Sequence, residues 1–173
     1  RGRLYPDDSL RLMEFRAALN RIFAENLADG ALATASSSRG KAFGAKNLLD
    51  GDYDSYWATP DNVNTASVTL SLPGERTFNR IMVQEYIPLG QRVAGFTVEA
   101  LSSDGDWYAI GTGTTIGYKR ILPVPETTTT AVRLLITKAY ACPVLNAIAL
   151  YQDDIYTIPA SGRDGHGRHL TGQ

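Results

Sequence analysis

The hydrophobic pattern of the chain changes character near Gly30. Before that residue, apolar side chains recur at steps of three and four, which places them on one face of a helix of about five turns. The positions are Leu12, Phe15, Leu19, Ile22 and Phe23, with Asn26 or Leu27 continuing the row. Asp8 or Ser9 suits the N-cap, and Gly30 after Asp29 is a typical stop. We expect this face to be buried on the following domain or on a domain outside this chain.

After Gly30 the period falls to two, the spacing of a half-buried strand. Alternation runs through residues 66–72, as far as Pro73-Gly74, and through residues 80–86. Further candidate strands contain Phe96, Val98 and Ala100; Trp107 and Ala109; residues 116–124; Val132, Leu134 and Ile136; and Ile148 with Leu150. Residues 126–130, a Glu followed by threonines, are polar and predict a loop. Many short strands separated by Gly, Pro and Asp turns predict an all-β fold, an antiparallel sandwich or barrel.

The composition indicates one domain with an appendage. The chain has 173 residues, 43% of them hydrophobic, and a net charge of −1, so its charge favours no nucleic-acid partner. No apolar run reaches the ~18 residues of a membrane span. Cys142 is the only cysteine, which excludes a disulfide within this chain. From Ala160 the sequence is polar and aperiodic, which predicts a flexible tail.

Residues 47–59 hold the densest candidate chemistry. Asp50, Asp52 and Asp54 precede Trp57, and the glycine after the first of them predicts a tight turn. Oxygen ligands converging from such a loop can bind Ca²⁺, although the spacing is not that of an EF-hand. The alternative is an acidic surface turn whose Trp57 fills the core. The residues alone leave both interpretations open.

Glu85 interrupts the hydrophobic pattern, because it continues the inward face of its strand. A carboxylate in that position needs a charged partner or a place at the rim, and Arg92 or Arg120 is the natural partner. One interpretation is an ion pair at the rim of the sandwich. The other is a polar platform for sugar hydroxyls with an aromatic face beside it. The candidates for that aromatic face are Tyr86, Tyr118 and Tyr140.

No set of residues resembles a catalytic constellation. The only histidines, His166 and His169, lie in the predicted tail without Cys or Glu ligands beside them. Asp50 and Asp52 belong to one tight loop rather than to two sides of a cleft, which does not suit acid–base work on a glycosidic bond.

Several motifs together resemble known proteins. Residues 33–38 (ATASSS), 45–51 (AKNLLDG) and 55–58 (SYWA) resemble the opening of a discoidin or coagulation-factor C-type domain, a family that includes bacterial carbohydrate-binding modules. Residues 83–87 (VQEYI), 90–93 (GQRV) and 113–121 (GTTIGYKRI) resemble the C-terminal β-sandwich of bacterial α-L-fucosidases of glycoside hydrolase family 29. Residues 15–28 resemble the segment that joins the fucosidase barrel to that sandwich.

The resemblance implies an eight-stranded jelly-roll-like sandwich, with Trp57 and Trp107 in its core. It also implies Ca²⁺ in the acidic loop. The ligands would be the Asp50 carboxylate, the Ser55 hydroxyl and backbone carbonyls near Lys46 and Asp52. This sequence departs from the pattern in the final strand, where Ala147 stands in place of an expected Glu. The loss of a carboxylate weakens a site for a hard cation.

The resemblance suggests three segments: a helix and linker from a preceding catalytic domain over 1–30, a discoidin-like sandwich over 31–152, and a tail over 153–173. In the fucosidases, the nucleophilic Asp and the acid/base residue lie in the barrel, upstream of the matching segment. A retaining glycosidase needs both carboxyl groups, so this chain alone is not expected to hydrolyse a fucoside.

The expected function is that of an accessory, carbohydrate-binding-like domain of an α-L-fucosidase. Its partner would be a fucose- or galactose-containing glycan, contacted by Glu85, Arg92, Tyr118 and Arg120. One alternative is a structural domain that braces the missing catalytic domain. Another is a cell-surface or membrane adhesion domain of the coagulation-factor type, although a membrane partner lacks a basic surround here. A periplasmic or secreted location follows from the resemblance alone.

Overall fold

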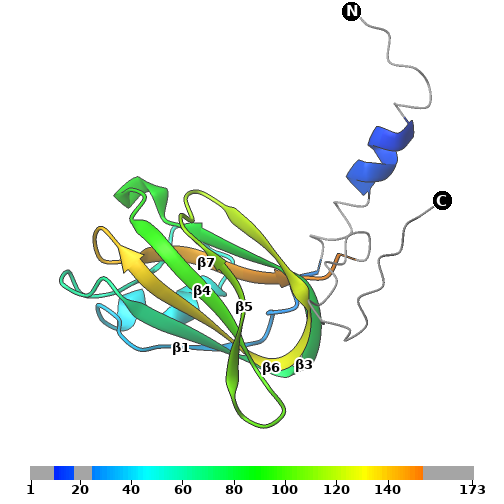
Figure 1. Ribbon diagram of the computed structural model, residues 1–173. Coiled ribbons are helices and arrows are strands. Elements are labelled where there is room, and N and C mark those ends of the chain that lie inside the picture. The colour runs from blue at the N-terminus through cyan, green and yellow to red at the C-terminus, as the bar shows by residue number, and fades with distance from the viewer. Residues whose placement is uncertain (1–9, 18–24, 154–173) are drawn as a thin grey trace, which may run out of the picture.

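The computed structural model describes residues 10–17 and 25–153. In this part of the chain, seven strands form one antiparallel sheet in the order β2-β7-β3-β6-β4-β5, with β1 paired to β3 (Figure 1). The strands are β1 (Leu32–Ala35), β2 (Trp57–Ala58), β3 (Ala66–Glu85), β4 (Val93–Leu101), β5 (Trp107–Gly113), β6 (Arg120–Ala139) and β7 (Val144–Tyr151). Three 3-10 helices, η1 (Lys41–Phe43), η2 (Ala45–Leu48) and η3 (Ile87–Leu89), lie in the connections.

The sheet becomes a sandwich because its two longest strands bend together. β3 and β6 pair along most of their length, and their register shifts between Ser71 and Arg76 and again between Phe78 and Arg80. The first part of β3 pairs with β1, whereas the last part pairs with β7. Each long strand therefore contributes to both layers, and the sheet folds over itself (Figure 1). Register irregularities of this kind bend a strand and increase its twist.

Two predicted interruptions of strands are wrong. β3 continues through Pro73-Gly74, and β6 continues through residues 126–130. Thr127 and Thr129 are buried, and their hydroxyls donate to the backbone carbonyls of Pro125 and Leu101, both at 2.7 Å. Threonine is β-branched and can satisfy its hydroxyl in this way, so a polar run forms a strand. The described residues contain seven strands instead of the eight expected, and β6 begins at Arg120 instead of residue 116.

The core confirms the inward sets that the alternation predicts. Phe96, Val98 and Ala100 are at most 1% exposed, and one hydrophobic cluster contains residues from both layers. Trp57 is fully buried, and its Nε1 donates to the Ser37 carbonyl at 3.0 Å. Trp107 does not belong to the core: it is half-buried on β5, at the edge of the sheet. The Arg133 guanidinium lies 4.4 Å from the centroid of its ring system, a cation–π contact.

The N-terminal segment differs from its prediction near its end. Residues 10–17 are helical, and Leu12 and Phe15 are exposed. The helix does not reach Gly30, because residues 25 and 26 are not helical and residues 27–30 form a turn. That turn is held on β7, where Leu27 N–H donates to the Leu150 carbonyl and Leu150 N–H donates to Asn26 Oδ1.

Other predicted features of the two terminal segments lie outside the described residues. They are Leu19, Ile22, Phe23, the tail over 154–173, and with it His166 and His169. Asp153, which the sequence assigns to the tail, is buried, and its N–H donates to Asn79 Oδ1 at 2.7 Å. Among the described helices, none is long and apolar enough to cross a membrane.

Glu85 fixes the loops at the end of the sandwich where β3 stops. It is 1% exposed. Its Oε1 accepts hydrogen bonds from the N–H groups of Arg92 and Val93 at 2.7 and 2.8 Å, and its Oε2 accepts one from Gly117 N–H at 2.7 Å. Glu85 N–H donates in turn to the Gly117 carbonyl at 2.9 Å. One side chain thereby holds the β3–β4 loop against the β5–β6 loop.

The predicted ion pair of Glu85 with Arg92 or Arg120 is therefore wrong. No salt bridge of Glu85 occurs among the described residues. Three backbone N–H groups satisfy the carboxylate instead, because hydrogen bonds to ionised acceptors offset much of the cost of burying the charge.

We predict that Glu85→Gln lowers the free energy of unfolding by about 1–3 kcal/mol. The amide nitrogen of glutamine would face a backbone N–H in place of an acceptor, so one buried donor would lose its partner. Urea unfolding of both proteins measures the difference. Glu75→Gln is the matched control, because Glu75 is exposed on the same strand, and it should change the value by less than about 0.5 kcal/mol. Equal stability of the Glu85→Gln variant and the parent protein would contradict this role.

A second prediction concerns the close packing of β4 against β5. A Cβ atom on Gly113 would lie 2.5 Å from Cε1 and Cζ of Phe96, whose side chain is buried. We expect Gly113→Ala to cost about 1–3 kcal/mol of stability through overpacking. Gly44→Ala is the control, since Gly44 has φ −75° and a Cβ atom there would meet only one neighbouring atom, at 3.7 Å. Similar midpoints for the two variants in urea would refute the packing argument.

Candidate functional site

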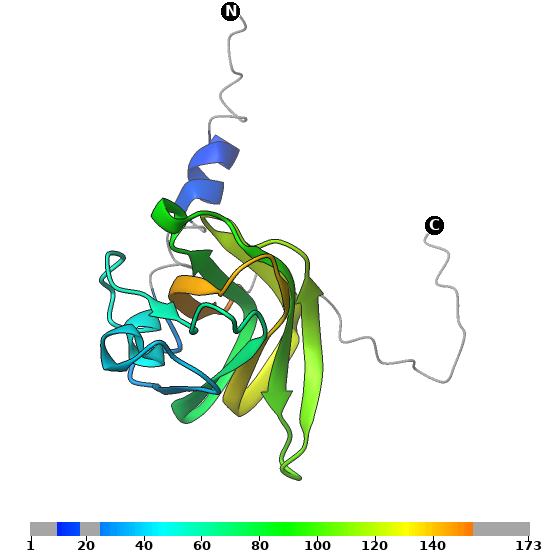
Figure 2. The same ribbon diagram turned by 90° about the vertical axis from the view of Figure 1, so that its left-hand side faces the viewer.

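The loops held by Glu85 share one end of the sandwich with the segments around η1 and β2 (Figure 2). Contacts between distant segments define this loop end. Arg39 Nε donates to the Thr59 carbonyl at 3.2 Å, and Tyr140 N–H donates to the Arg92 carbonyl at 2.9 Å. The β3–β4, β5–β6 and β6–β7 loops therefore form one surface together with residues 36–44 and 56–65.

Two arginines converge on the single cysteine at this end. Arg39 Nη2 lies 3.2 Å and Arg92 Nη1 lies 3.0 Å from Cys142 Sγ, and Arg92 Nη1 also donates to the Cys142 carbonyl at 3.0 Å. Arg39 forms a salt bridge with the exposed Asp61. Cys142 itself is buried. The arrangement fixes the Arg92 guanidinium at the surface of the loop end.

The aromatic residues of the loop end fall into two groups. The rings of Phe43, Tyr56 and Tyr86 stack in series, with centroid separations of 5.2 and 4.6 Å. These three rings are half-buried and support the loops. Tyr118 and Tyr140 are 74% and 78% exposed. They are the rings whose faces a ligand can reach.

The four predicted contact residues lie near this end but in different environments. Glu85 is buried and both of its oxygens are occupied by backbone N–H groups, so its predicted contact with a ligand does not fit its position. Arg92 and Arg120 are half-buried, and Tyr118 directly follows Gly117. Arg120 lies directly opposite Val83 of β3. The two side chains therefore point to the same face of the sheet, at its rim.

Sequence reasoning missed Arg39 and Cys142. Arg39 stands alone after a run of serines, and its contacts come from segments 20 and 103 residues away. No local pattern reports such a pairing. Cys142 carried no signal beyond being the only cysteine of the chain, a residue type that is often buried.

The acidic loop is folded by its own side chains. Asp50 Oδ1 accepts from Asp52 N–H at 2.9 Å, and Asp52 Oδ1 accepts from Asp54 N–H at 2.9 Å. The Ser55 hydroxyl donates to Asp50 Oδ2 and also lies 3.0 Å from the Asp52 carbonyl oxygen. Gly51 has φ 70°, the conformation expected for glycine in this turn. Local Asx turns of this kind shape loops without any ligand.

Three of the four predicted calcium ligands therefore lie together: the Asp50 carboxylate, the Asp52 carbonyl and the Ser55 hydroxyl. The Lys46 carbonyl accepts from Leu49 N–H at 3.1 Å. Ca²⁺ takes six to eight oxygens, and this set supplies four, only one of them a carboxylate. No group of three or more His, Cys, Asp or Glu side chains that could hold a metal occurs within residues 10–17 and 25–153. The calcium site stays a prediction.

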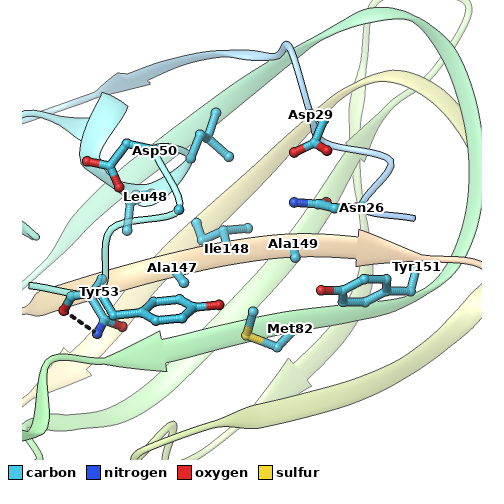
Figure 3. Close-up of a pocket in the computed structure, with 13 residues that line it drawn as sticks. Asn26, Asp29, Leu48, Asp50, Tyr53, Met82, Ala147, Ile148, Ala149 and Tyr151 are labelled. Carbon is cyan, nitrogen blue, oxygen red and sulfur yellow. Dashed lines mark hydrogen bonds between the residues drawn. The ribbon is translucent and has the colours of Figure 1, made fainter. Parts of the chain in front are cut away.

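A cavity of about 230 Å³ lies beside this loop, on the outer face of β7 (Figure 3). Its floor is apolar and contains Met82, Ala147 and Ala149, a small cluster separate from the main core. Asp29 and Asp50 lie on one side of β7, and Tyr53 and Tyr151 on the other, with the two hydroxyls facing each other across Met82 (Figure 3). Asn26 and Asn146 complete the polar part of the lining.

Burial raises the pKa of Tyr151 above its ordinary value, and negative charge on Tyr53 and Asp29 raises that pKa further. The phenol of Tyr151 therefore stays protonated and able to donate at neutral pH.

The chain matches known proteins across this fold. Residues 33–149 match the F5/8 type C domain family. The chain is 34% identical over 157 residues to alpha-L-fucosidase 1 of Arabidopsis thaliana, a match that covers 88% of this chain and 31% of that protein. The fucosidase similarity is thus not confined to bacterial enzymes.

Two solved structures illustrate the similarity of fold. A GH29 fucosidase of Ruminococcus gnavus in complex with fucose superposes with a TM-score of 0.78 at 29% identity, covering 88% of this chain and 31% of that one. Chitosan-binding module 1 from a chitosanase/glucanase of Paenibacillus sp. IK-5 superposes with a TM-score of 0.66 at 25% identity, covering 73% of this chain and 98% of the module.

The chain spans about a third of the length of the fucosidases that it matches. Its antiparallel β-sandwich and the match over residues 33–149 agree. The chain belongs to the F5/8 type C domain family and is homologous to a part of the α-L-fucosidases.

Proposed function

We propose that this domain is the carbohydrate-binding accessory domain of an α-L-fucosidase and that it binds a fucose- or galactose-containing glycan at the loop end. The observation that carries the proposal is the exposed ring of Tyr118 beside loops whose backbone is fixed by a buried carboxylate. A sugar ring stacks its C–H face on such an aromatic side chain, while charged groups hold its hydroxyls.

In this proposal the contact residues are Tyr118, Arg92 and Arg120, and Glu85 is a positioning residue. Arg92 is already oriented by its hydrogen bonds to the Leu89 and Cys142 carbonyls, so less conformational entropy is lost when a ligand binds. The chitosan-binding module and the fucosidases among the matches support a carbohydrate ligand. A periplasmic or secreted location would suit this role.

A second candidate function is a brace for a catalytic domain. The observation that favours it is the apolar face of the helix at 10–17, where Leu12 and Phe15 are 45% and 56% exposed. Fucosidases that match this chain are about three times its length, and a catalytic domain could cover that face. The adhesion alternative has no such observation behind it: in the sequence, the basic residue nearest to Ile87 and Leu89, the exposed apolar residues of η3, is the single Arg92.

The proposal also includes a Ca²⁺ ion bound in the acidic loop. The Asp50 carboxylate, the Ser55 hydroxyl and the carbonyls of Lys46 and Asp52 would hold the ion, whose chemistry here would be structural. Binding is expected to be weak, on the order of millimolar, because the set has one carboxylate.

The sugar-binding proposal predicts saturable chemical-shift changes in an NMR titration with L-fucose, galactose and N-acetylglucosamine. We expect shifts in the amides of Arg92 and Gly117–Arg120, with a dissociation constant of about 1–10 mM. Tyr118→Ala should weaken binding about two- to tenfold through the lost ring contact. Tyr108→Ala is the control, because Tyr108 is an exposed tyrosine on β5, and it should leave the affinity unchanged.

An absence of shifts up to about 50 mM sugar would reject the binding role and leave the brace. The brace is tested separately by the affinity of this chain for the isolated catalytic domain, which Leu12→Glu together with Phe15→Glu should weaken.

The calcium proposal predicts that Ala147→Glu tightens Ca²⁺ binding at least about tenfold, because Ala147 and Asp50 line the same cavity and a second carboxylate suits a hard cation. Isothermal titration calorimetry after removal of Ca²⁺ with a chelator measures the affinity. Ala147→Gln, which introduces a side chain of the same size as glutamate but neutral, is the control. Equal affinities of the two variants would show that the loop is not a calcium site.

A further inference from the structure

The loop end carries positive charge, although the whole chain has a net charge of −1. Its segments are residues 36–44, 56–65, 86–92, 114–120 and 140–143. The basic residues of these segments are Arg39, Lys41, Arg92, Lys119 and Arg120. Asp61 is their single acidic residue, and the buried Glu85 adds one negative charge behind them. A surface with this excess of positive charge attracts an anionic ligand.

Two of these charges meet at one point of the loop end. Arg39 Nη2 lies 3.2 Å and Arg92 Nη1 lies 3.0 Å from Cys142 Sγ. The two nitrogens are therefore at most about 6 Å apart, a gap that one oxyanion can bridge, because a guanidinium N–H donates to a carboxylate oxygen at about 2.7–2.9 Å. The planar fork of arginine also matches the geometry of a carboxylate and of similar oxyanions.

Both guanidinium groups keep donors for such a ligand. Arg92 donates through Nε to the Leu89 carbonyl and through Nη1 to Cys142, and its Nη2 meets no acceptor among the described residues. Arg39 donates through Nε and Nη2, and its Nη1 is without an acceptor in the same part of the chain. The bonds already made fix the plane of each group, so little rotamer freedom remains to be lost on binding.

The charge of Arg92 is not neutralised by a side-chain partner. Arg92 takes part in no salt bridge between described residues, and Glu85 accepts its backbone N–H instead of its guanidinium group. Arg39 does pair with Asp61, whose side chain is 82% exposed, and an exposed ion pair of this kind is weak. An anionic group of a ligand therefore gains the charge of Arg92 and can replace Asp61 beside Arg39.

Tyr140 lies next to Arg92, because its N–H donates to the Arg92 carbonyl at 2.9 Å. Lys138 Nζ lies 5.9 Å from the centroid of the Tyr140 ring, which adds positive charge at that ring. Tyr118 and Tyr140 are 74% and 78% exposed, against 38% and 43% for the two exposed apolar residues of η3. The side chains most open to a ligand here are thus aromatic rings, which suit the C–H face of a sugar better than an acyl chain.

We propose that the glycan bound at the loop end is acidic, with Arg92 and Arg39 holding a carboxylate or sulfate group of the sugar and an exposed tyrosine ring supporting its C–H face. This inference rests on the proposed function, because it names the class of glycan that the same site takes. A carboxylate and a sulfate ester offer the same oxyanion chemistry, so two acidic probes separate them. An anionic lipid offers the charge without the pyranose ring.

The test is an NMR titration of the full chain with D-galacturonate and D-galactose at neutral pH. The two sugars differ only at C6, which is a carboxylate in galacturonate and a hydroxymethyl group in galactose. We expect galacturonate to bind at least about fivefold more tightly, with saturable shifts in the amides of Arg92, Gly117–Arg120 and Tyr140. The preference should shrink at least about twofold between about 20 and 500 mM salt, because the arginines are partly exposed. Galactose 6-sulfate assigns the oxyanion as a sulfate if it binds more tightly than galacturonate, and as a carboxylate if it binds more weakly.

Asp61→Asn is the sharpest variant, since this exposed side chain can be changed without disturbing the core. It removes the negative charge beside the arginines and should tighten galacturonate binding at least about twofold, while galactose binding stays unchanged. Asp104→Asn changes an exposed aspartate in the β4–β5 turn; it is the matched control and should affect neither sugar. Arg92→Gln should remove most of the preference for galacturonate, whereas Arg11→Gln, which removes an exposed charge from the N-terminal helix, should keep it.

The outcomes separate this inference from the proposed function. Equal binding of the two sugars would overturn the acidic class and leave the glycan proposal intact, whereas binding of neither up to about 50 mM would reject both. A preference for galacturonate that survives in Arg92→Gln, or an unchanged affinity in Asp61→Asn, would reject the two arginines as its cause. Vesicles of phosphatidylcholine with and without phosphatidylserine test the lipid. Cosedimentation only with phosphatidylserine, without a preference for galacturonate, would assign the arginines to a membrane surface and overturn the proposal.

Discussion

A buried carboxylate at the end of β3 sets the arrangement of the loops. Glu85 continues the inward face of its strand at a place where the core meets the loop end. Burying a charge there is costly unless it is fully hydrogen-bonded. Three backbone N–H groups, from Arg92, Val93 and Gly117, meet that requirement. The β3–β4 and β5–β6 loops must therefore approach each other, and Gly117 takes φ 71° as part of this geometry.

The second constraint is the bend shared by β3 and β6. Both layers of the sandwich come from one hydrogen-bonded sheet because these strands pair before and after their register shifts. The inner face is filled by one continuous core. The outer face of β7 carries small residues instead, Ala147 and Ala149, and this leaves room for the cavity beside the acidic loop. The loop end and the outer face of β7 are thus two distinct surfaces with different chemistry.

The two surfaces also differ in how their polar groups are satisfied. At the loop end, guanidinium groups and carbonyls are already hydrogen-bonded to each other, as Arg92 is to Leu89 and Cys142. A ligand there would use the exposed tyrosine rings and the guanidinium N–H groups that are left. Beside the cavity on β7, the Asp50 carboxylate accepts from its own loop, at Asp52 and Ser55. Both surfaces are compatible with the family match over residues 33–149, because one fold can carry binding sites for many different ligands.

The short motifs within residues 33–58 and 83–121 were sufficient for the family resemblance, which also implied the burial of Trp57. Period-two alternation was sufficient for the all-β class and for the inward positions of β4 and β7, because it reports which side chains face a core. It failed where a polar run pairs with a distant strand, as Thr127 and Thr129 pair with β3, since a strand's neighbours cannot be read from its own residues. The partners of Glu85, the convergence of two arginines on Cys142 and the cavity beside β7 required the folded chain. Their groups are far apart in the sequence, and contacts between them depend on how separate segments meet in space.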